Sequence, residues 1–283
     1  MFSAGKQFRD AMKAEKPLQV VGVMNAFVAM MAKETGFRAL YLSGGGVANF
    51  AHGLPDLAVT TLNDVLEEVR RIKSAVDLPL LVDIDTGWGN SLMIARTIRS
   101  MIAAGAAGVQ IEDQVSDKRC GHRPGKQVVQ IEEMVERLKA VVDARSDPNF
   151  VIVARADGTD LIERGIAYQN AGADIFFPEA VRSLEQYQEI KRALTIPVLA
   201  NMTEFGQTPL CTVQELAKVG IDVVLYPLTV ARVMNHAAQS ALQVIRQKGT
   251  QKLLLDSMQT REELYRILNY YKQEQKICLS TKD

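Results

Sequence analysis

The sequence predicts one α/β domain folded as a (β/α)8 barrel of the TIM type, with an extra N-terminal helix and C-terminal helices. Short apolar runs rich in β-branched residues alternate with segments of helical period along the 283 residues. Such nearly continuous apolar runs are typical of strands buried on both faces of a parallel sheet. A doubly wound open sheet is the alternative, but no G-x-G-x-x-G motif follows the first run.

Eight strands are expected, each followed by a helix. They cover residues 19–26, 39–44, 78–85, 108–113, 150–157, 174–180, 197–202 and 223–228. The clearest helical patterns between them are residues 61–76 and 131–146.

The junctions before these strands alternate strictly between proline and glycine. The prolines are Pro17, Pro79, Pro148 and Pro197, and the glycines are Gly36, Gly105, Gly172 and Gly220. Glycine suits the left-handed cap that ends a helix, and proline stops a helix just past its end. The alternation predicts four repeated β-α-β-α units.

Helices are also expected outside the barrel, over residues about 3–15 and 260–276. The second has Leu264, Ile267 and Leu268 on one face, which suits packing against a partner subunit or against its own barrel. No linker divides the chain, so residues 1–283 are predicted as one catalytic domain with a helical extension from about residue 251.

Composition excludes several classes of protein. The 33 Lys and Arg balance 33 Asp and Glu, which argues against nucleic-acid and anionic-membrane partners. The longest charge-free stretches, 17–32 and 39–55, are too short and too polar to span a bilayer, and the N-terminal segment lacks a secretory pattern. Three cysteines, Cys120, Cys211 and Cys278, are too few for a disulfide framework, so a cytoplasmic protein is expected.

Polar residues follow the predicted strands where a purely structural strand would stay apolar. In barrels of this type the catalytic groups lie at the carboxyl ends of the strands. The set comprises Tyr41, Ser43, Gly44–Gly46, Asp83, Asp85, Glu112, Asp113, Arg155, Asp157, Glu179, Asn201, Thr203 and Tyr226.

The sharpest motif in this set is VDIDTGWG. Asp83 and Asp85 are two residues apart, so both side chains leave the strand on the same face. Two neighbouring carboxylates among apolar residues are costly unless a cation lies between them, and Mg²⁺ fits, with Glu112 in support. The structural alternative is that one aspartate caps a helix and the other binds an arginine.

A basic loop, residues 117–126, and a triple glycine form the other two candidate features. Cys120 lies among Lys118, Arg119 and His122, a setting that activates a thiol, as nucleophile or as proton donor. Gly121 and Gly125 would let this loop act as a lid, whereas the alternative is a solvated loop with an incidental cysteine. The glycines Gly44–Gly46 suit either an anion contact or a tight turn.

The motifs taken in order resemble the isocitrate lyase/phosphoenolpyruvate mutase superfamily over essentially the whole chain. They are LYLSGGG, GLPD, VDIDTGWG, IEDQ, KRCGH, ARAD, FPEA, NMTEFG and YPL. Within the superfamily, the chain resembles the branch that cleaves 2-methylisocitrate in the methylcitrate cycle of propionate catabolism. Isocitrate lyases carry KKCGH, and have Trp-Met-Glu where this chain has Phe177, Pro178 and Glu179. Phosphoenolpyruvate mutases and oxaloacetate decarboxylases lack the Cys-Gly-His loop.

The resemblance implies reversible cleavage of 2-methylisocitrate to pyruvate and succinate by an Mg²⁺-dependent lyase. Asp83 and Asp85 would hold the metal, with Asp56 and Glu112 in support through water, and Cys120 would be the catalytic acid. Tyr41, polarised by Arg155, is our candidate for the base. The implied substrate contacts are Ser43, Gly44, Gly45, Gly121, His122, Arg155, Glu179, Asn201, Thr203, Arg232 and Arg261.

Two further expectations come with the resemblance. The assembly should be a homotetramer that exchanges C-terminal helices, and the turn after Arg155 is shorter than in the family. The alternatives are a relative acting on another 2-oxo or 2-hydroxy acid (an isocitrate lyase, an oxaloacetate decarboxylase or a phosphonopyruvate-type enzyme) and a catalytically silent barrel.

Overall fold

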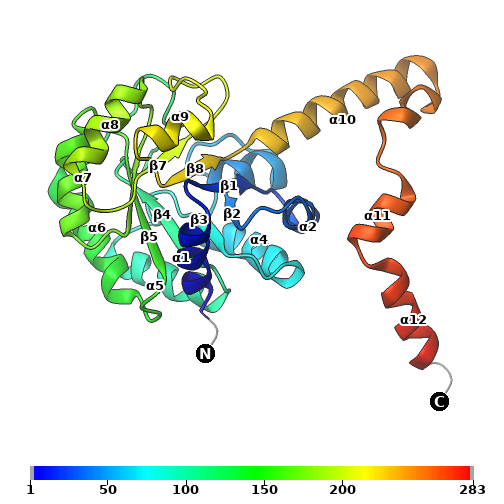
Figure 1. The fold of residues 1–283 in the computed structure, drawn as a ribbon, viewed down its shortest axis with the longest axis horizontal. Helices are drawn as coiled ribbons and strands as arrows, with labels where there is room; N and C mark the ends of the chain where they lie inside the picture. The colour runs from blue at the N-terminus through cyan, green and yellow to red at the C-terminus, as the bar shows by residue number, and fades with distance from the viewer. Residues whose placement is uncertain (1–2, 281–283) are drawn as a thin grey trace. The chain divides into compact units, whose positions relative to one another are not determined.

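Parallel strands form a barrel in the computed structural model, which describes residues 3–280 (Figure 1). The strands are β1 (Leu18–Gly22), β2 (Ala39–Leu42), β3 (Leu80–Asp83), β4 (Gly108–Glu112), β5 (Val151–Ala156), β6 (Ile175–Pro178), β7 (Leu199–Asn201) and β8 (Val223–Tyr226). Their order in the sheet is β6-β5-β4-β3-β2-β1-β8-β7, and a parallel bridge between Phe176 and Val198 joins the two edges. All eight predicted strands are therefore present, and the (β/α)8 prediction is confirmed.

The helices surround the strands in the expected alternation. They are α2 (Ala26–Glu34), α3 (Gly44–Gly46), η1 (Val47–Ala51), α4 (Leu62–Ala75), α5 (Ser91–Ala103), α6 (Ile131–Ala144), α7 (Leu161–Asn170), α8 (Leu184–Ala193) and α9 (Val213–Lys218). The junction glycines Gly36, Gly105, Gly172 and Gly220 have φ between 84° and 101°, so they end their helices in the left-handed conformation that the sequence predicts.

Apolar side chains from nearly all the strands fill the barrel, and the helix α1 (Ala4–Ala14) covers its amino end. Phe8 of α1 is fully buried and packs in the same core as Leu18, Leu81 and Val153. Arg9 donates to the Asn149 carbonyl at 2.9 Å, which ties α1 to the loop before β5. Because this end is closed, only the opposite end, where the strands finish, is available for a site.

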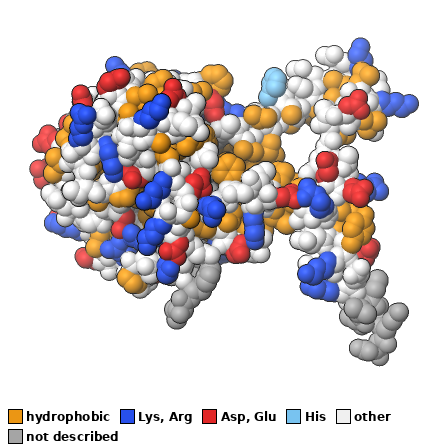
Figure 2. Space-filling view, in the orientation of Figure 1, with side chains coloured by type: hydrophobic (Ala, Val, Ile, Leu, Met, Phe, Trp, Pro, Cys, Tyr) orange, Lys and Arg blue, Asp and Glu red, His pale blue; other side chains and the backbone are white. Residues whose placement is uncertain are grey.

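Residues Val230–Asp283 form a second compact unit, distinct from the unit Met1–Thr229. It contains most of α10 (Thr229–Lys248), η2 (Lys252–Ser257), α11 (Arg261–Ile267) and α12 (Tyr270–Ser280). The prediction of one helix over residues 260–276 is wrong, because Asn269 adopts the left-handed conformation with φ 52° and separates α11 from α12. Figure 2 shows apolar side chains at the surface of this unit. Its exposed apolar residues include Val233, Leu242 and Leu253.

The described residues also show the state of two cysteines and the character of the helices. Cys120 and Cys211 are free thiols, whereas the side chain of Cys278 lies outside the described part. None of the helices between residues 3 and 280 has both the length and the apolar character that crossing a membrane requires.

Candidate active site

The polar residues that follow the strands meet around one small cavity at the carboxyl end of the barrel. Its lining includes Tyr41, Asp83, Cys120, Arg155 and Glu179, which come from β2, β3, the loop after β4, β5 and the end of β6. The cavity measures about 80 Å³, well below the usual size of small-molecule sites. A ligand the size of a tricarboxylate would therefore need the lining of the cavity to move apart. A larger hollow of about 550 Å³ is lined by Asp85 but not by Cys120 or Arg155.

The two aspartates of VDIDTGWG point toward the same place, the backbone of Gly44. A Cβ atom on Gly44 would lie 2.9 Å from Asp85 Oδ1 and 3.4 Å from Asp83 Oδ2. The Gly44 N–H donates to Asp83 Oδ2 at 3.1 Å, and the Asp85 N–H donates to Asp83 Oδ1 at 3.0 Å. A Cβ atom on Gly45 would lie 2.8 Å from Asp56 Oδ2. The glycines after β2 thus allow three carboxylates to gather there.

Lys118 brings the charge that balances these acids. Its Nζ lies 2.6 Å from Asp85 Oδ1 and 2.6 Å from Asp56 Oδ1, and its side chain is 5% exposed. Burial, followed by repulsion from Asp83, raises the pKa of Asp85 to about 6. Although burial opposes it, the surrounding carboxylates, Asp85 first, raise the pKa of Lys118. The ammonium therefore remains charged among the acids.

The donor set at this point fits a hard divalent cation. Among the residues that the structure describes, no group of three His, Cys, Asp or Glu side chains converges as a complete metal site. Mg²⁺ does not need one, because it is commonly bound by one or two carboxylates together with water and substrate oxygens. The Asp83 and Asp85 carboxylates beside Gly44, with Asp56 close by, supply that kind of partial set.

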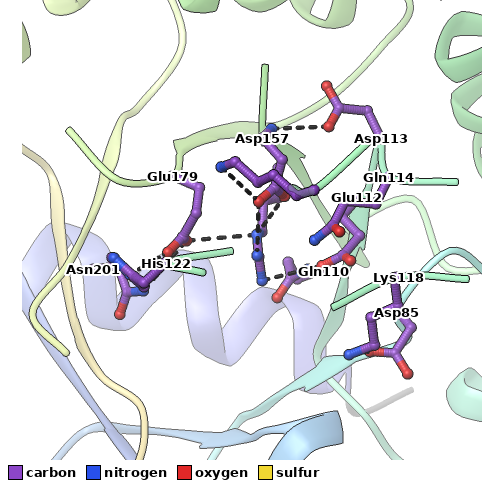
Figure 3. A network of polar contacts seen from close by, with 12 residues as sticks. Asp85, Gln110, Glu112, Asp113, Gln114, Lys118, His122, Asp157, Glu179 and Asn201 are labelled. Carbon is purple, nitrogen blue, oxygen red and sulfur yellow. Dashed lines mark hydrogen bonds and ion pairs between the residues drawn. The ribbon is translucent and has the colours of Figure 1, made fainter. Parts of the chain in front are cut away.

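Arg155 is surrounded by three carboxylates, those of Glu112, Asp157 and Glu179. These three acids are labelled in Figure 3. Its Nη1 lies 3.1 Å from Glu112 Oε2, and its Nε lies 2.9 Å from Asp157 Oδ2 and 3.5 Å from Glu179 Oε2. Burial raises the pKa of Glu112 well above its usual range, although Arg155 opposes this. Asp157 comes from the short four-residue connection between β5 and α7, so this connection fixes the orientation of Arg155.

Glu179, at the end of β6, joins Arg155 to the histidine of the cysteine loop. Its carboxylate contacts His122 Nε2 and accepts from Asn201 Nδ2 at 3.3 Å. Although burial opposes it, Arg155 and then His122 lower the pKa of Glu179 to about 2. Figure 3 shows Glu179, His122 and Asn201 side by side. The carboxylate therefore stays ionised and orients the imidazole.

Tyr41 lies in the barrel beneath the acids and donates to Gln110 Oε1 at 2.7 Å. Burial, then repulsion from Asp83, raises the pKa of Tyr41 well above its usual value, while Arg155 opposes this. The phenol is therefore protonated at neutral pH.

The cysteine loop lies close against Arg155. A Cβ atom on Gly121 would lie 2.3 Å from Arg155 Nη2 and 2.7 Å from Glu179 Cγ, so only glycine allows this approach. Lys126 pairs with Asp157 Oδ1 at 3.1 Å near the far end of the loop. Cys120, beside Gly121, is exposed and borders the cavity.

Similarity to known proteins shows the family to which the chain belongs. Residues 8–246 match the family model of phosphoenolpyruvate phosphomutase. A 2-methylisocitrate lyase of Shewanella oneidensis is 56% identical over 97% of this chain and 96% of its own, and one of Vibrio cholerae is 55% identical over 97% and 93%. The chain belongs to the phosphoenolpyruvate mutase/isocitrate lyase superfamily, in the 2-methylisocitrate lyase family. The solved structure of a 2,3-dimethylmalate lyase has a TM-score of 0.90 at 31% identity, covering 100% of this chain and 96% of that one.

Most of the residues expected from the family resemblance meet around the cavity, but two do not belong to the barrel unit. Ser43, Thr203 and Asn201 line the cavity. Arg232 and Arg261 lie on α10 and α11 of the second unit, and their contact with substrate stays a prediction.

Three residues make contacts at the site that the sequence did not predict. Lys118 stands there only as part of a basic loop, yet it reaches Asp56 and Asp85. Gln110 interrupts the apolar run of β4, which is a readable signal for a buried polar contact. Gln207 follows NMTEFG without any distinguishing pattern, and its contact with His122 depends on the tertiary structure alone.

Proposed function

We propose that this protein cleaves 2-methylisocitrate reversibly to pyruvate and succinate, with Mg²⁺ at Asp83 and Asp85 and Cys120 as the proton donor. The names of the most similar relatives support the substrate. The observation that carries the residue roles is the placement of the cysteine loop. Lys118 reaches Asp85 and Gly121 lies on Arg155, so Cys120 between them borders the same cavity as the acids.

Charge balance supports the metal. The buried cations Lys118 and Arg155 already contact five carboxylates, those of Asp56, Asp85, Glu112, Asp157 and Glu179. The positive charges of Lys118 and Arg155 are therefore already balanced by protein carboxylates, and they cannot also neutralise the three carboxylates of the substrate. Asp83 and Asp85 would hold the ion, with Asp56 and Glu112 in support through water. A bound Mg²⁺ would stabilise negative charge on the substrate's 2-oxygen and on the adjacent carboxylate.

The reaction breaks the bond between C2 and C3 of the substrate. For Tyr41 to act as the base, its phenol must first give up its own proton. The phenolate would then take the proton of the 2-hydroxyl group, and the oxygen electrons would form the carbonyl of pyruvate. Arg155 assists because its charge opposes the rise in the pKa of Tyr41 caused by burial and by Asp83. Neutralising Asp83 would remove a further part of that rise, whereas burial, the larger cause, would still favour the protonated phenol.

The electrons of the broken bond pass to C3, which lies next to a carboxylate. Cys120 gives its S–H proton to C3, and succinate results. His122 and Gly121 place this thiol, because they fix the loop against Glu179 and Arg155. Ser43, Gly45, Asn201 and Thr203 line the cavity and would orient the substrate carboxylates, with Gly44 beside them. Arg155 and Glu179 also border the cavity, and the ionised Glu179 would act there by orienting Arg155 and His122.

The test is incubation of the protein with 2-methylisocitrate, with and without EDTA, followed by detection of both pyruvate and succinate. We expect stoichiometric products that disappear on chelation and return with added Mg²⁺. A panel of isocitrate, 2,3-dimethylmalate, oxaloacetate and phosphonopyruvate separates the related activities. Preferred turnover of any of these, or chelator-resistant activity, would overturn the corresponding part of the proposal.

We also propose a cytoplasmic homotetramer that exchanges its C-terminal helices. Val233, Leu242 and Leu253 in the second unit are each at least 65% exposed, and surfaces of this kind commonly mark subunit contacts. Light scattering coupled to gel filtration tests the assembly, and a monomer at micromolar concentration would contradict it.

A further inference from the structure

Gln207, a residue in the turn after β7, forms hydrogen bonds to the cysteine loop. The Gln207 N–H donates to His122 Nδ1 at 3.0 Å, and its side-chain Nε2 donates to the His122 carbonyl at 3.1 Å. One residue thus binds both the ring and the backbone of His122. Since His122 is two residues from Cys120, this contact bears directly on where the thiol lies.

The contact also determines which nitrogen of the imidazole carries the proton. Nδ1 accepts from the Gln207 N–H, so the ring proton is on Nε2, the nitrogen that contacts Glu179. His122 is thereby held between two elements of the barrel, the end of β6 and the turn after β7. A loop fixed on both sides of this ring cannot shift without losing both contacts.

The turn that carries Gln207 is shaped for this approach. Phe205 adopts the left-handed conformation with φ 60°, which is uncommon for an aromatic residue and typical of functional segments. A Cβ atom on Gly206 would lie 2.7 Å from His122 Nδ1, so any larger residue would push the ring away. The Thr229 hydroxyl donates to Glu204, which anchors the start of the turn.

Arg182, in the connection between β6 and α8, holds the other end of the Gln207 side chain. Its Nη2 donates to Gln207 Oε1 at 3.3 Å. The Arg182 N–H in turn donates to Gln186 Oε1 at 2.8 Å, so the arginine backbone is tied to α8. The Gln207 amide is therefore oriented with its N–H₂ toward the loop.

We propose that Gln207 is a positioning residue that holds the cysteine loop closed through His122 and so places Cys120 at the cavity. The proposal rests on the proposed function for the role of Cys120, but the closing contact itself does not. The cavity of about 80 Å³ is too small for a tricarboxylate, so this loop, which forms part of its lining, would have to open to admit the substrate. A contact made of two exposed hydrogen bonds suits that task, because it is weak enough to break in every cycle.

Two variants distinguish the hydrogen bond from Gln207 Nε2 to the His122 carbonyl from the hydrogen bond that Gln207 Oε1 accepts from Arg182. Gln207→Met keeps the length of the side chain and removes both polar groups. Gln207→Glu keeps an acceptor for Arg182 and removes the N–H that binds the His122 carbonyl. The exposed Gln214 of α9 supplies the matched control, Gln214→Met.

Loop closure is measured on the free protein by limited trypsin digestion, with cleavage at Arg119 and Lys126 followed by mass spectrometry. We expect both Gln207 variants to be cleaved about 3- to 10-fold faster than the wild type, the effect of one partly exposed hydrogen bond. Their kcat/KM for 2-methylisocitrate should fall by a similar factor, with thermal unfolding and the Mg²⁺ dissociation constant unchanged. Gln214→Met should match the wild type in every measurement.

Unchanged cleavage in both variants would overturn the proposal. So would a Gln207→Glu protein that behaves like the wild type, because the contact with Arg182 would then be the one that matters. A protein inactive toward 2-methylisocitrate would refute the proposed function and not this contact, since the digestion needs no substrate.

Discussion

Glu179→Gln tests whether the carboxylate between Arg155 and His122 is held ionised by its surroundings. Glu179 has a pKa of about 2 in the folded protein, compared with 4.5 for an ordinary glutamate. Each pKa unit corresponds to about 1.4 kcal/mol, so the charged form contributes about 3 kcal/mol of stability at neutral pH. The residue is almost fully buried, so solvent screening does not reduce this contribution much.

The direction of the pH dependence follows from the lowered pKa. Between pH 4.5 and pH 2 the unfolded chain binds the proton and the folded protein does not, so this contribution is complete above pH 4.5 and declines as the pH falls. About 2 kcal/mol of it should be lost between pH 6 and pH 3. The glutamine side chain of the variant cannot ionise, so the variant lacks this dependence.

Urea unfolding followed by circular dichroism at pH 6 and pH 3 measures the effect. We expect the difference in unfolding free energy between the wild type and Glu179→Gln to shrink by about 2 kcal/mol on acidification. Glu189→Gln, at an exposed position of α8, is the control and should show no such change. A difference that is the same at both pH values would refute the reasoning.

Three further substitutions test the other parts of the site. Cys120→Ser should lower kcat at least about 100-fold while circular dichroism and Mg²⁺ binding stay normal, and near-normal turnover would remove the assignment of the acid. Asp85→Ala should lose activity that rising Mg²⁺ restores only in part, as a titration of initial rates would show, and full activity at low Mg²⁺ would contradict a metal role. Lys118→Met should destabilise the metal-free protein by about 3 kcal/mol, because it leaves buried carboxylates without their cation. Mg²⁺ should then raise the melting temperature of Lys118→Met more than that of the wild type, and an equal rise would show that the ammonium and the metal act independently.

The contacts of the cysteine loop explain how the barrel rim positions the thiol that we propose as the proton donor. Lys118 binds the acids beside β3, His122 lies between β6 and the turn after β7, and Lys126 binds Asp157. Each contact reaches a different part of the barrel rim, so the loop is held at three separate points.

Local sequence pattern was sufficient for the barrel and for the location of the site. Strands buried on both faces must be continuously apolar, and helices before even-numbered strands end at glycine, so both features can be read from adjacent residues. Asp83 and Asp85 were predicted to share a face because a strand repeats every two residues. Both do lie against Gly44, but β3 ends at Asp83, and Asp85 reaches the same place from a turn in which it has φ 50°. The break at Asn269 was missed because helical periodicity continues across it and one left-handed residue leaves little trace in the pattern.

The amino-acid sequence alone determined the fold class, the family and the set of residues at the carboxyl ends of the strands. The tertiary structure decided which of those residues meet: Lys118 with Asp56, 62 positions away, and His122 with Gln207, 85 positions away. The physical reason is that periodicity and turn residues report interactions within a few residues, whereas ion pairs and hydrogen bonds across the rim depend on closure of the barrel. Closure of the barrel brings loops that are distant in the sequence to the carboxyl ends of the strands. Charge and distance then decide which of their side chains pair.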